Sequence, residues 1–390
     1  MAARRGSPSV RLAQLTAAKE ILLSTGSGGV GKTTTAAAIG AQVAATVDAK
    51  VLVLTVDPAK RLANAMGLKT FGNKEVRISP DLFLDAGVEP AGELWAAMLD
   101  TKQSWDDLIA RHAPDSGVRD AILANPIYQN ISAKFVQSHD YVAMERLYEI
   151  HTAGNYDLIV VDTPPTRNAV DFLDAPERLA DFFGSRLLRW LIAPYRSRVV
   201  SVASRPFYNI ADRILGTQFL EDIAEFFVLF QTMRRDFTER AEAVSRLLGG
   251  QATSFVVVST LEAAPVREAR YFLDLLHERK YHVGAVVLNK VLPSTLLDPD
   301  ATAAAKSMVA EPETIAPHLF EVLDNDEHAP RMLAEIGASY LNYQVVAQRE
   351  AELRSELGTQ AGTVASVPYF SHDIADLAGL LELGETLWES

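Results

Sequence analysis

The feature that most limits how this chain can fold is a glycine-rich loop between an apolar run and a helix-forming run. The run Ile21–Thr25 leads into the loop Gly26–Thr34, with the sequence GSGGVGKTT, and the alanine-rich residues 35–39 follow. The loop satisfies the pattern G-x-x-x-x-G-K-[ST] in the strand–loop–helix context that the pattern requires. The sequence therefore predicts an α/β fold in which a buried strand delivers this loop to a helix N-terminus.

The residue types in the loop are those that bind a nucleoside triphosphate. Glycines allow consecutive backbone N–H groups to turn toward a phosphate, and the helix N-terminus adds partial positive charge. We expect Lys32 to contact the β- and γ-phosphates and the Thr33 hydroxyl to ligate Mg²⁺. The predicted nucleotide-binding residues here are Gly26, Ser27, Gly28, Gly29, Val30, Gly31, Lys32, Thr33 and Thr34.

Seven short apolar runs are continuous rather than alternating, as buried parallel strands are. They are Ile21–Thr25, Val51–Val56, Leu82–Ala86, Leu158–Asp162, Phe255–Ser259, Val283–Asn289 and Gly362–Val367. Helical patterns separate most of them, which is typical of a doubly wound, mostly parallel α/β sheet.

Two long stretches have helical patterns and no strand run, roughly residues 90–151 and 169–248. We interpret them as helices that cover the sheet, or as a helical subdomain that moves when the nucleotide changes; both can hold for different helices. The predicted organisation is a flexible N-terminal tail over residues 1–18 and a single P-loop ATPase domain over residues 19–390.

Composition excludes several classes of protein. The 390 residues contain no cysteine, so disulfides and thiolate zinc sites are excluded, and the net charge of −13 disfavours nucleic-acid binding. A DNA-partitioning ATPase built on the same loop is disfavoured for the same reason. The sequence has no signal peptide and no apolar stretch of membrane-spanning length, so we expect a cytoplasmic protein, with peripheral membrane contact left open.

Two aspartates end predicted strands in the half of the chain that carries the loop. Asp57 closes VLVLTVD and Asp162 closes YDLIVVD. Ligands of parallel α/β sheets lie beyond the carboxyl ends of the strands, so both carboxylates can converge on the loop. We assign Asp162 to Mg²⁺, directly or through water, and Asp57 to the attacking water, although either could simply cap a helix.

The segments that follow these two aspartates are candidate switch loops that sense the γ-phosphate. The first begins at Pro58, and the second begins at Thr163 and Pro164.

The motifs of this chain, taken together, resemble those of a known family. The phosphate loop, DPAKRLANAMG, DTPPTRNAVDFL and VVLNKVLP together resemble the arsenite-pump ATPases and the tail-anchored-protein targeting ATPases, which are dimeric nucleotide switches with a deviant Walker A loop. The resemblance implies that Asp57 activates water, that Asp162 lies near Mg²⁺, that Asn289 reads adenine and that the loop Pro368–Asp373 closes over the base. No N-K-x-D pattern follows Asn289, which favours ATP over GTP.

The chain departs from that family at three points. Ser27 stands where the family has a lysine that reaches the other subunit's phosphates, which suggests either a heterodimer with a lysine-bearing relative or compensation by Lys60 or Arg61. Without cysteine, the family's interfacial zinc site cannot form and no zinc is expected. Arsenic sensing through cysteines is likewise unsupported.

A basic stretch without acidic residues, residues 185–205, is a candidate partner surface. It includes Arg189, Trp190 and Arg196, and an amphipathic basic segment can dock on an acidic protein or an anionic membrane. The alternative is a solvated helix whose arginines pair within the fold.

The function predicted from the sequence is a dimeric ATP-hydrolysing switch that acts on a protein client. The alternative is a weakly active regulatory subunit that binds ATP and pairs with a related, lysine-bearing ATPase.

Overall fold

The structure of the chain is a computed structural model that describes residues 12–56, 63, 65–68, 72–131, 136–164, 173–175, 178, 181, 217–319 and 328–389. At its centre is an eight-stranded sheet with the order β3-β4-β2-β5-β1-β6-β7-β8. Every neighbouring pair is parallel except β3–β4. The strands are β1 (Ile21–Gly26), β2 (Lys50–Thr55), β3 (Val76–Arg77), β4 (Glu93–Met98), β5 (Leu158–Asp162), β6 (Thr253–Ser259), β7 (Val283–Val291) and β8 (Val364–Pro368).

The central strands are apolar on both faces because each face packs on its own core. In β1, Ile21 and Leu23 belong to one apolar cluster, whereas Leu22 between them belongs to the other. The same alternation occurs in β2, β5, β6 and β7. Continuous apolar runs are therefore what a doubly wound sheet requires, which confirms the predicted fold class.

Helices from both ends of the described chain cover one face of the sheet. These are α1 (Leu12–Ala18), α2 (Lys32–Thr46), α4 (Pro80–Asp85) and α19 (Leu377–Glu389). The other face is covered by α8 (Val136–Ala153), α13 (Arg234–Leu248) and α14 (Ala263–Glu278).

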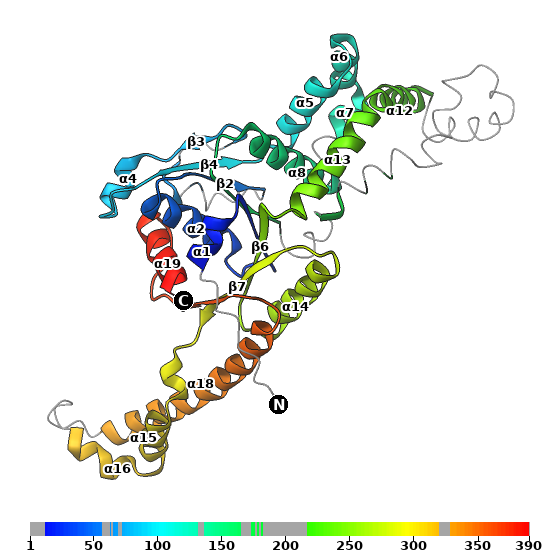
Figure 1. Ribbon diagram of the computed structural model, residues 1–390. Coiled ribbons are helices and arrows are strands. Elements are labelled where there is room, and N and C mark those ends of the chain that lie inside the picture. Colours follow the sequence, from blue (N-terminus) through cyan, green and yellow to red (C-terminus); the bar gives the residue numbers. More distant parts are fainter. Residues whose placement is uncertain are drawn as a thin grey trace, which may run out of the picture.

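A helical group extends from this second face (Figure 1). It contains α5 (Thr101–His112), α6 (Ser116–Ala124), α7 (Pro126–Ile131), α12 (Thr217–Phe230) and the short turn η1 (Gln231–Met233), which pack with α8 and α13. Its interior is aromatic: the Phe237 ring centroid lies 5.3 Å from that of Phe230, 5.9 Å from that of Tyr141 and 6.5 Å from that of Trp105. The described residues 101–131, 136–153 and 217–248 thus pack as one helical group.

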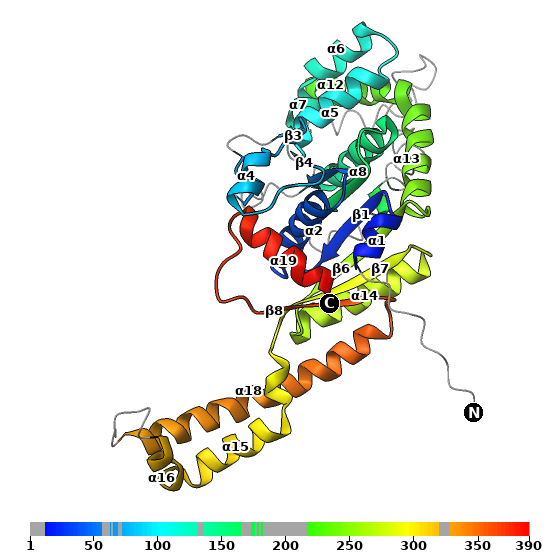
Figure 2. The ribbon, with the colours of Figure 1, turned by 60° about the vertical axis from the view of Figure 1, so that its left-hand side comes forward.

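A second projection, which leaves the sheet at its β7–β8 edge (Figures 1 and 2), was not predicted from the sequence. The helices α15 (Pro299–Ala310), α16 (Pro312–Ile315) and α18 (Ala329–Gly358), with the turns η2 (Ser294–Leu297) and η3 (Ala316–Leu319), form a hairpin that points away from the sheet (Figures 1 and 2). The two long helices approach closely at Gly337, where a Cβ atom would lie 2.6 Å from the carbonyl oxygen of Ala305.

Three predictions on secondary structure are wrong. Leu82–Ala86 was expected to be a strand but lies in and just after α4, because Ser79 caps that helix by accepting a hydrogen bond from Asp81 and Pro80 fits its first turn. Residues 93–98 were assigned to a helical stretch but form β4. The predicted flexible tail is too long, since α1 begins at Leu12.

The helix α1 is held by apolar burial, because Leu12 and Leu15 pack into the core on the first face of the sheet. Within the described part of the chain, no helix has the length and apolar character needed to cross a bilayer.

Candidate functional site

The phosphate loop connects β1 to α2 and has the backbone conformation that its glycines allow. Gly29 and Gly31 have φ angles of 81° and 98°, in the left-handed region that L-residues avoid. At Gly26 a Cβ atom would overlap the carbonyl oxygen of Val258 on the neighbouring strand β6. The loop therefore needs glycine at these positions for conformation or for space, and its backbone stays open to a ligand at the N-terminus of α2.

The lysine of the G-K-[ST] pattern, Lys32, lies inside the loop. Lys32 is the first residue of α2, its side chain is buried, and its Nζ donates to the carbonyl oxygen of Ser27 at 2.9 Å. The Ser24 hydroxyl donates to the carbonyl oxygen of Lys32 at 3.2 Å, which fixes the start of the helix on β1. The ammonium group thus lies at the centre of the loop, where a bound polyphosphate would place its negative charge.

A carboxylate and a hydroxyl meet beside the loop. The Thr33 hydroxyl donates to Oδ2 of Asp162 at 2.6 Å, and the Thr55 hydroxyl donates to the same oxygen at 3.0 Å. Asp162 ends β5 and is fully buried, and Thr55 ends the adjacent strand β2 in register with it. The structure therefore brings together Thr33 and Asp162, which were predicted separately to serve Mg²⁺, and adds Thr55, which was not predicted. Hydroxyl and carboxylate oxygens are the ligands Mg²⁺ prefers.

The start of the second predicted switch segment is anchored to β1. The Thr163 hydroxyl donates to the carbonyl oxygen of Ser24 at 2.9 Å, and the backbone N–H of Thr163 donates to the same oxygen at 3.2 Å. Pro164 is half-buried and is the last residue described in this segment. The backbone is therefore held in place at Thr163, one residue beyond the buried end of β5.

Asn289 lies against the phosphate loop. Its Nδ2 donates to the carbonyl oxygen of Val30 at 2.8 Å, and its Oδ1 accepts from the backbone N–H of Lys290 at 3.0 Å. A Cβ atom on Gly31 would overlap this amide, so the glycine also leaves space for Asn289. Lys290 has a φ angle of 58°, an uncommon conformation for a non-glycine residue that is often found at functional sites.

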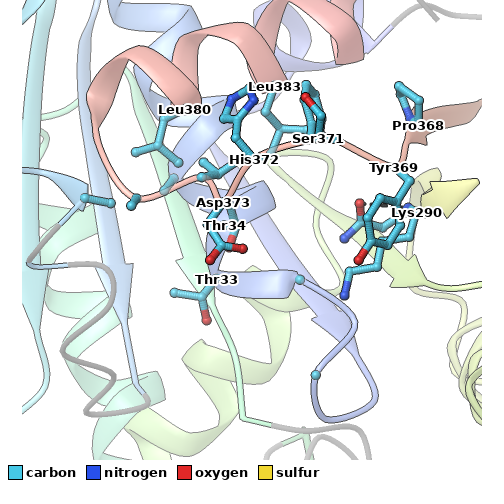
Figure 3. A pocket seen from close by; sticks show the side chains of 18 residues that line it. Thr33, Thr34, Lys290, Pro368, Tyr369, Ser371, His372, Asp373, Leu380 and Leu383 are labelled. Carbon is cyan, nitrogen blue, oxygen red and sulfur yellow. Dashed lines mark hydrogen bonds between the residues drawn. The ribbon is translucent and has the colours of Figure 1, made fainter.

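A cavity of about 740 Å³ opens beside the loop, within the size range of small-molecule sites. Its lining includes Gly29, Gly31, Thr33, Thr34, Asn289 and Pro368 together with residues 369–375, which connect β8 to α19. The expected adenine-side residues Asn289 and Pro368 therefore share one cavity with the phosphate loop (Figure 3).

The cavity lining also includes Lys290, Tyr369 and Asp373, which were not predicted individually, although the last two belong to the loop Pro368–Asp373 that the resemblance places over the base. The Lys290 Nζ lies 6.0 Å from the centroid of the Tyr369 ring, and Asp373 lines the cavity together with Thr34 (Figure 3). The sequence signal for Lys290 was its position directly after Asn289. Tyr369 and Asp373 carried no signal of their own, because only the return of β8 beside β7 brings their loop to the site.

Several predicted residues lie outside the described residues. Asp57 and Pro58 are among them, as are Lys60 and Arg61. The last described residue before them is Val56, whose backbone N–H donates to the carbonyl oxygen of Asp162 at 3.1 Å. The candidate partner surface with Arg189, Trp190 and Arg196 also falls outside the described range.

Ser27 is the residue at which the loop departs from the family pattern. It is 8% exposed, and its Oγ has no hydrogen-bond partner among the described residues. Across the same residues, no group of three or more histidine, aspartate or glutamate side chains is arranged to hold a metal ion. The Thr33–Asp162 pair could contribute to a cation site, and would need oxygen atoms of a ligand or of water to complete it.

Comparison with known proteins agrees with this geometry. Residues 19–312 match the family described as anion-transporting ATPase. The chain is 24% identical over 283 residues to a putative arsenical pump-driving ATPase of Chlorobaculum tepidum, covering 70% of this chain and 61% of that protein. It is 26% identical over 283 residues to the ATPase get3 of Schizosaccharomyces japonicus, covering 70% and 74% of the two chains. It is 23% identical over 270 residues to the ATPase ASNA1 homolog of Entamoeba dispar, covering 69% and 75%.

Proposed function

The chain belongs to the anion-transporting ATPase family, and we propose that it is a cytoplasmic, dimeric nucleotide switch that couples hydrolysis of Mg²⁺–ATP to the handling of a protein client. The observation that carries the proposal is the Thr33–Asp162 hydrogen bond of 2.6 Å beside the phosphate loop. It joins the start of the loop helix to the end of β5, so a ligand that separates the two groups acts on both elements.

The residues of the site have distinct roles in this proposal. Lys32 and the backbone N–H groups of the loop bind the β- and γ-phosphates, and Asn289 with the loop from Pro368 binds the adenine. Thr33 and Asp162 hold Mg²⁺, directly or through water. When bound, the metal offsets the negative charge that develops on the phosphate oxygens during phosphoryl transfer.

Asp57 orients the water that attacks the γ-phosphate. The support for this role is its place in the sequence: it follows β2, whose end is in register with Asp162. A carboxylate there can accept a proton from a water in line with the bond to be broken.

The switch itself is a change in the segments after Asp57 and Asp162. Loss of the γ-phosphate removes a contact that orders them, a common way for nucleotide hydrolysis to reach distant elements. The helical group is the element we expect to respond, because α8 precedes β5 directly along the chain and packs on both α5 and α13.

The basic stretch that contains Arg189, Trp190 and Arg196 is our candidate surface for the client. Reversing Arg189 and Arg196 to glutamate should abolish client capture and leave ATP binding intact. Unchanged capture by that double variant would place the client elsewhere.

Ser27 favours a second candidate, a regulatory subunit that binds ATP and completes a related ATPase. Neither site of a homodimer would receive a lysine from its partner's loop, and cations supplied in trans can raise phosphoryl-transfer rates by about 10³–10⁵. The intact Lys32, Thr33 and Asp162 count against a purely regulatory role.

Restoring the missing cation separates the two candidates. Ser27→Lys in the full chain should raise steady-state ATP turnover by at least about tenfold if the homodimer forms and lacks only this charge, well below the trans-cation limit. Ser27→Gln, of similar length but uncharged, is the matched control. If the wild-type chain already turns over ATP and neither variant exceeds it, the missing charge is supplied within the chain and the regulatory candidate fails.

A further inference from the structure

The hairpin carries an exposed apolar stripe along its longer helix, α18. Met332, Ile336, Tyr343 and Val346 are between 46% and 57% exposed, and Ser339, between Ile336 and Tyr343, is also exposed. Their spacing, including Ser339, is four, three, four and three residues. This is the heptad spacing that brings one edge of a helix against another helix, with apolar residues at the a and d positions.

The stripe is separate from the face by which α18 packs within its own hairpin. That inner face uses Leu333, Gly337 and Ala347, which are buried, and Tyr340, whose hydroxyl donates to the carbonyl oxygen of Thr295 at 2.8 Å. The hairpin therefore has its own apolar core, and the residues of the stripe are not needed to complete that core. The helix α18 points away from the sheet (Figure 2), so a partner that binds its outer part need not touch the nucleotide site.

Charges beside the stripe indicate what covers it. In heptad terms Ile336 and Tyr343 are at a positions and Ser339 and Val346 at d positions, so the g positions are Glu335, Asn342 and Arg349. Two antiparallel copies of the helix in a–d register place Ile336 against Val346 and Tyr343 against Ser339, each twice. The same register places Glu335 against Arg349 at both ends.

Over the layers from Ile336 to Val346 this match is self-complementary in shape and in charge, whereas the next layer outward sets Met332 against Glu350. The bulky Tyr343 meets the smallest residue of the stripe, and each end of the pair joins one acid to one base. A two-fold axis near Asn342 generates both halves, as an isologous interface requires. Within one chain Glu335 forms an ion pair with the exposed Arg331, at 3.0 Å, and exposed pairs of this kind hold side chains weakly.

We propose that the α18 stripe is a second self-association surface, through which two copies of this chain pair their hairpins as an antiparallel coiled coil. The surface is independent of the nucleotide-dependent dimer. The helix is already formed and supported by α15, so pairing does not have to order it. Because the seam is short and belongs with the small class of interfaces below about 1,200 Å², we expect a dissociation constant on the order of micromolar.

The test is sedimentation equilibrium of the full chain without nucleotide, over a range of micromolar concentrations. The chain should self-associate, and Lys32→Ala should self-associate equally because the phosphate loop takes no part. Val346→Asp should weaken association by at least tenfold, whereas Val345→Asp should not. Val345 is the more exposed of the two, at 66% against 48%, so general surface stickiness predicts the opposite order.

A charge exchange tests the register. Glu335→Arg alone and Arg349→Glu alone should each weaken association, and the double exchange should restore it. Circular dichroism of each variant checks that the helices remain formed. The proposal would be overturned by a chain that stays monomeric at all concentrations, by equal effects of Val345→Asp and Val346→Asp, or by a double exchange that associates no better than the single ones. It would also be overturned if the chain associated only with a different protein, which would then be the partner of the stripe.

Discussion

Gly31→Ala is the substitution for which the structure allows the loss of folding stability to be worked out most fully. Gly31 has a φ angle of 98°, and a Cβ atom there would overlap the side-chain amide of Asn289. An L-residue in the left-handed region costs about 1–2 kcal/mol. Displacing Asn289 also weakens its hydrogen bond to the carbonyl oxygen of Val30, worth about 1 kcal/mol net. We therefore expect the free energy of unfolding to fall by about 2–3 kcal/mol.

Two neighbouring glycines separate these contributions. Gly29 has a φ angle of 81° and open space around the position of a Cβ atom, so Gly29→Ala should show the backbone cost alone, about 1–2 kcal/mol. Gly28 has open space and no positive φ angle, so Gly28→Ala should change stability by less than about 0.5 kcal/mol.

Equilibrium urea unfolding without nucleotide, followed by tryptophan fluorescence, measures the series directly. The decrease in the free energy of unfolding should be largest for Gly31→Ala, smaller for Gly29→Ala and smallest for Gly28→Ala. If Gly31→Ala costs no more than Gly29→Ala, then Asn289 does not depend on the space that Gly31 leaves, and the described contact between the loop and β7 is not a stabilising one.

Three other predictions follow from single contacts. Asp162→Asn should weaken the Mg²⁺-dependent part of ATP binding by about 10–100-fold, as measured by calorimetry with and without Mg²⁺. Thr55→Val should have a smaller effect, because it removes only a hydroxyl that donates to the Asp162 carboxylate. Burial lowers the pKa of His112 below its ordinary value of 6.5, so protonation favours the unfolded chain; stability should fall as the pH drops below 6.5, and the fall should be smaller in His112→Gln. Arg240→Met should destabilise the helical group by about 3 kcal/mol in urea unfolding, because it leaves the carboxylate of Glu145, only 3% exposed, without its ion pair.

The site was largely predictable from the sequence because its parts are local or follow from strand polarity. The phosphate loop is a continuous motif, and the ends of parallel strands meet at one edge of the sheet. That reasoning was sufficient to expect Asp162 beside Thr33, whereas Asn289 was expected at the site from the family resemblance. It could not single out Thr55, which looks like one more residue of an apolar strand, or Tyr369 and Asp373, whose approach depends on the path of the chain after β8.

The errors in secondary structure have a common physical origin. Leu82–Ala86 is as apolar as a strand, but its state is decided by Ser79 and Pro80 just before it. Residues 93–98 become a strand because β2 offers an edge to pair with, which no local pattern reveals. The hairpin was missed although Asp298 caps α15 and Pro299 follows it, a start signal that the sequence does carry.

The most direct test of the central claim is steady-state ATP hydrolysis by the purified full chain, with and without proteins co-purified from its native host, compared with Lys32→Ala and Asp57→Asn. The account predicts Mg²⁺-dependent turnover, by the chain alone or with a related P-loop partner, that both substitutions abolish. Turnover that survives in Lys32→Ala, or none under any of these conditions, would contradict it.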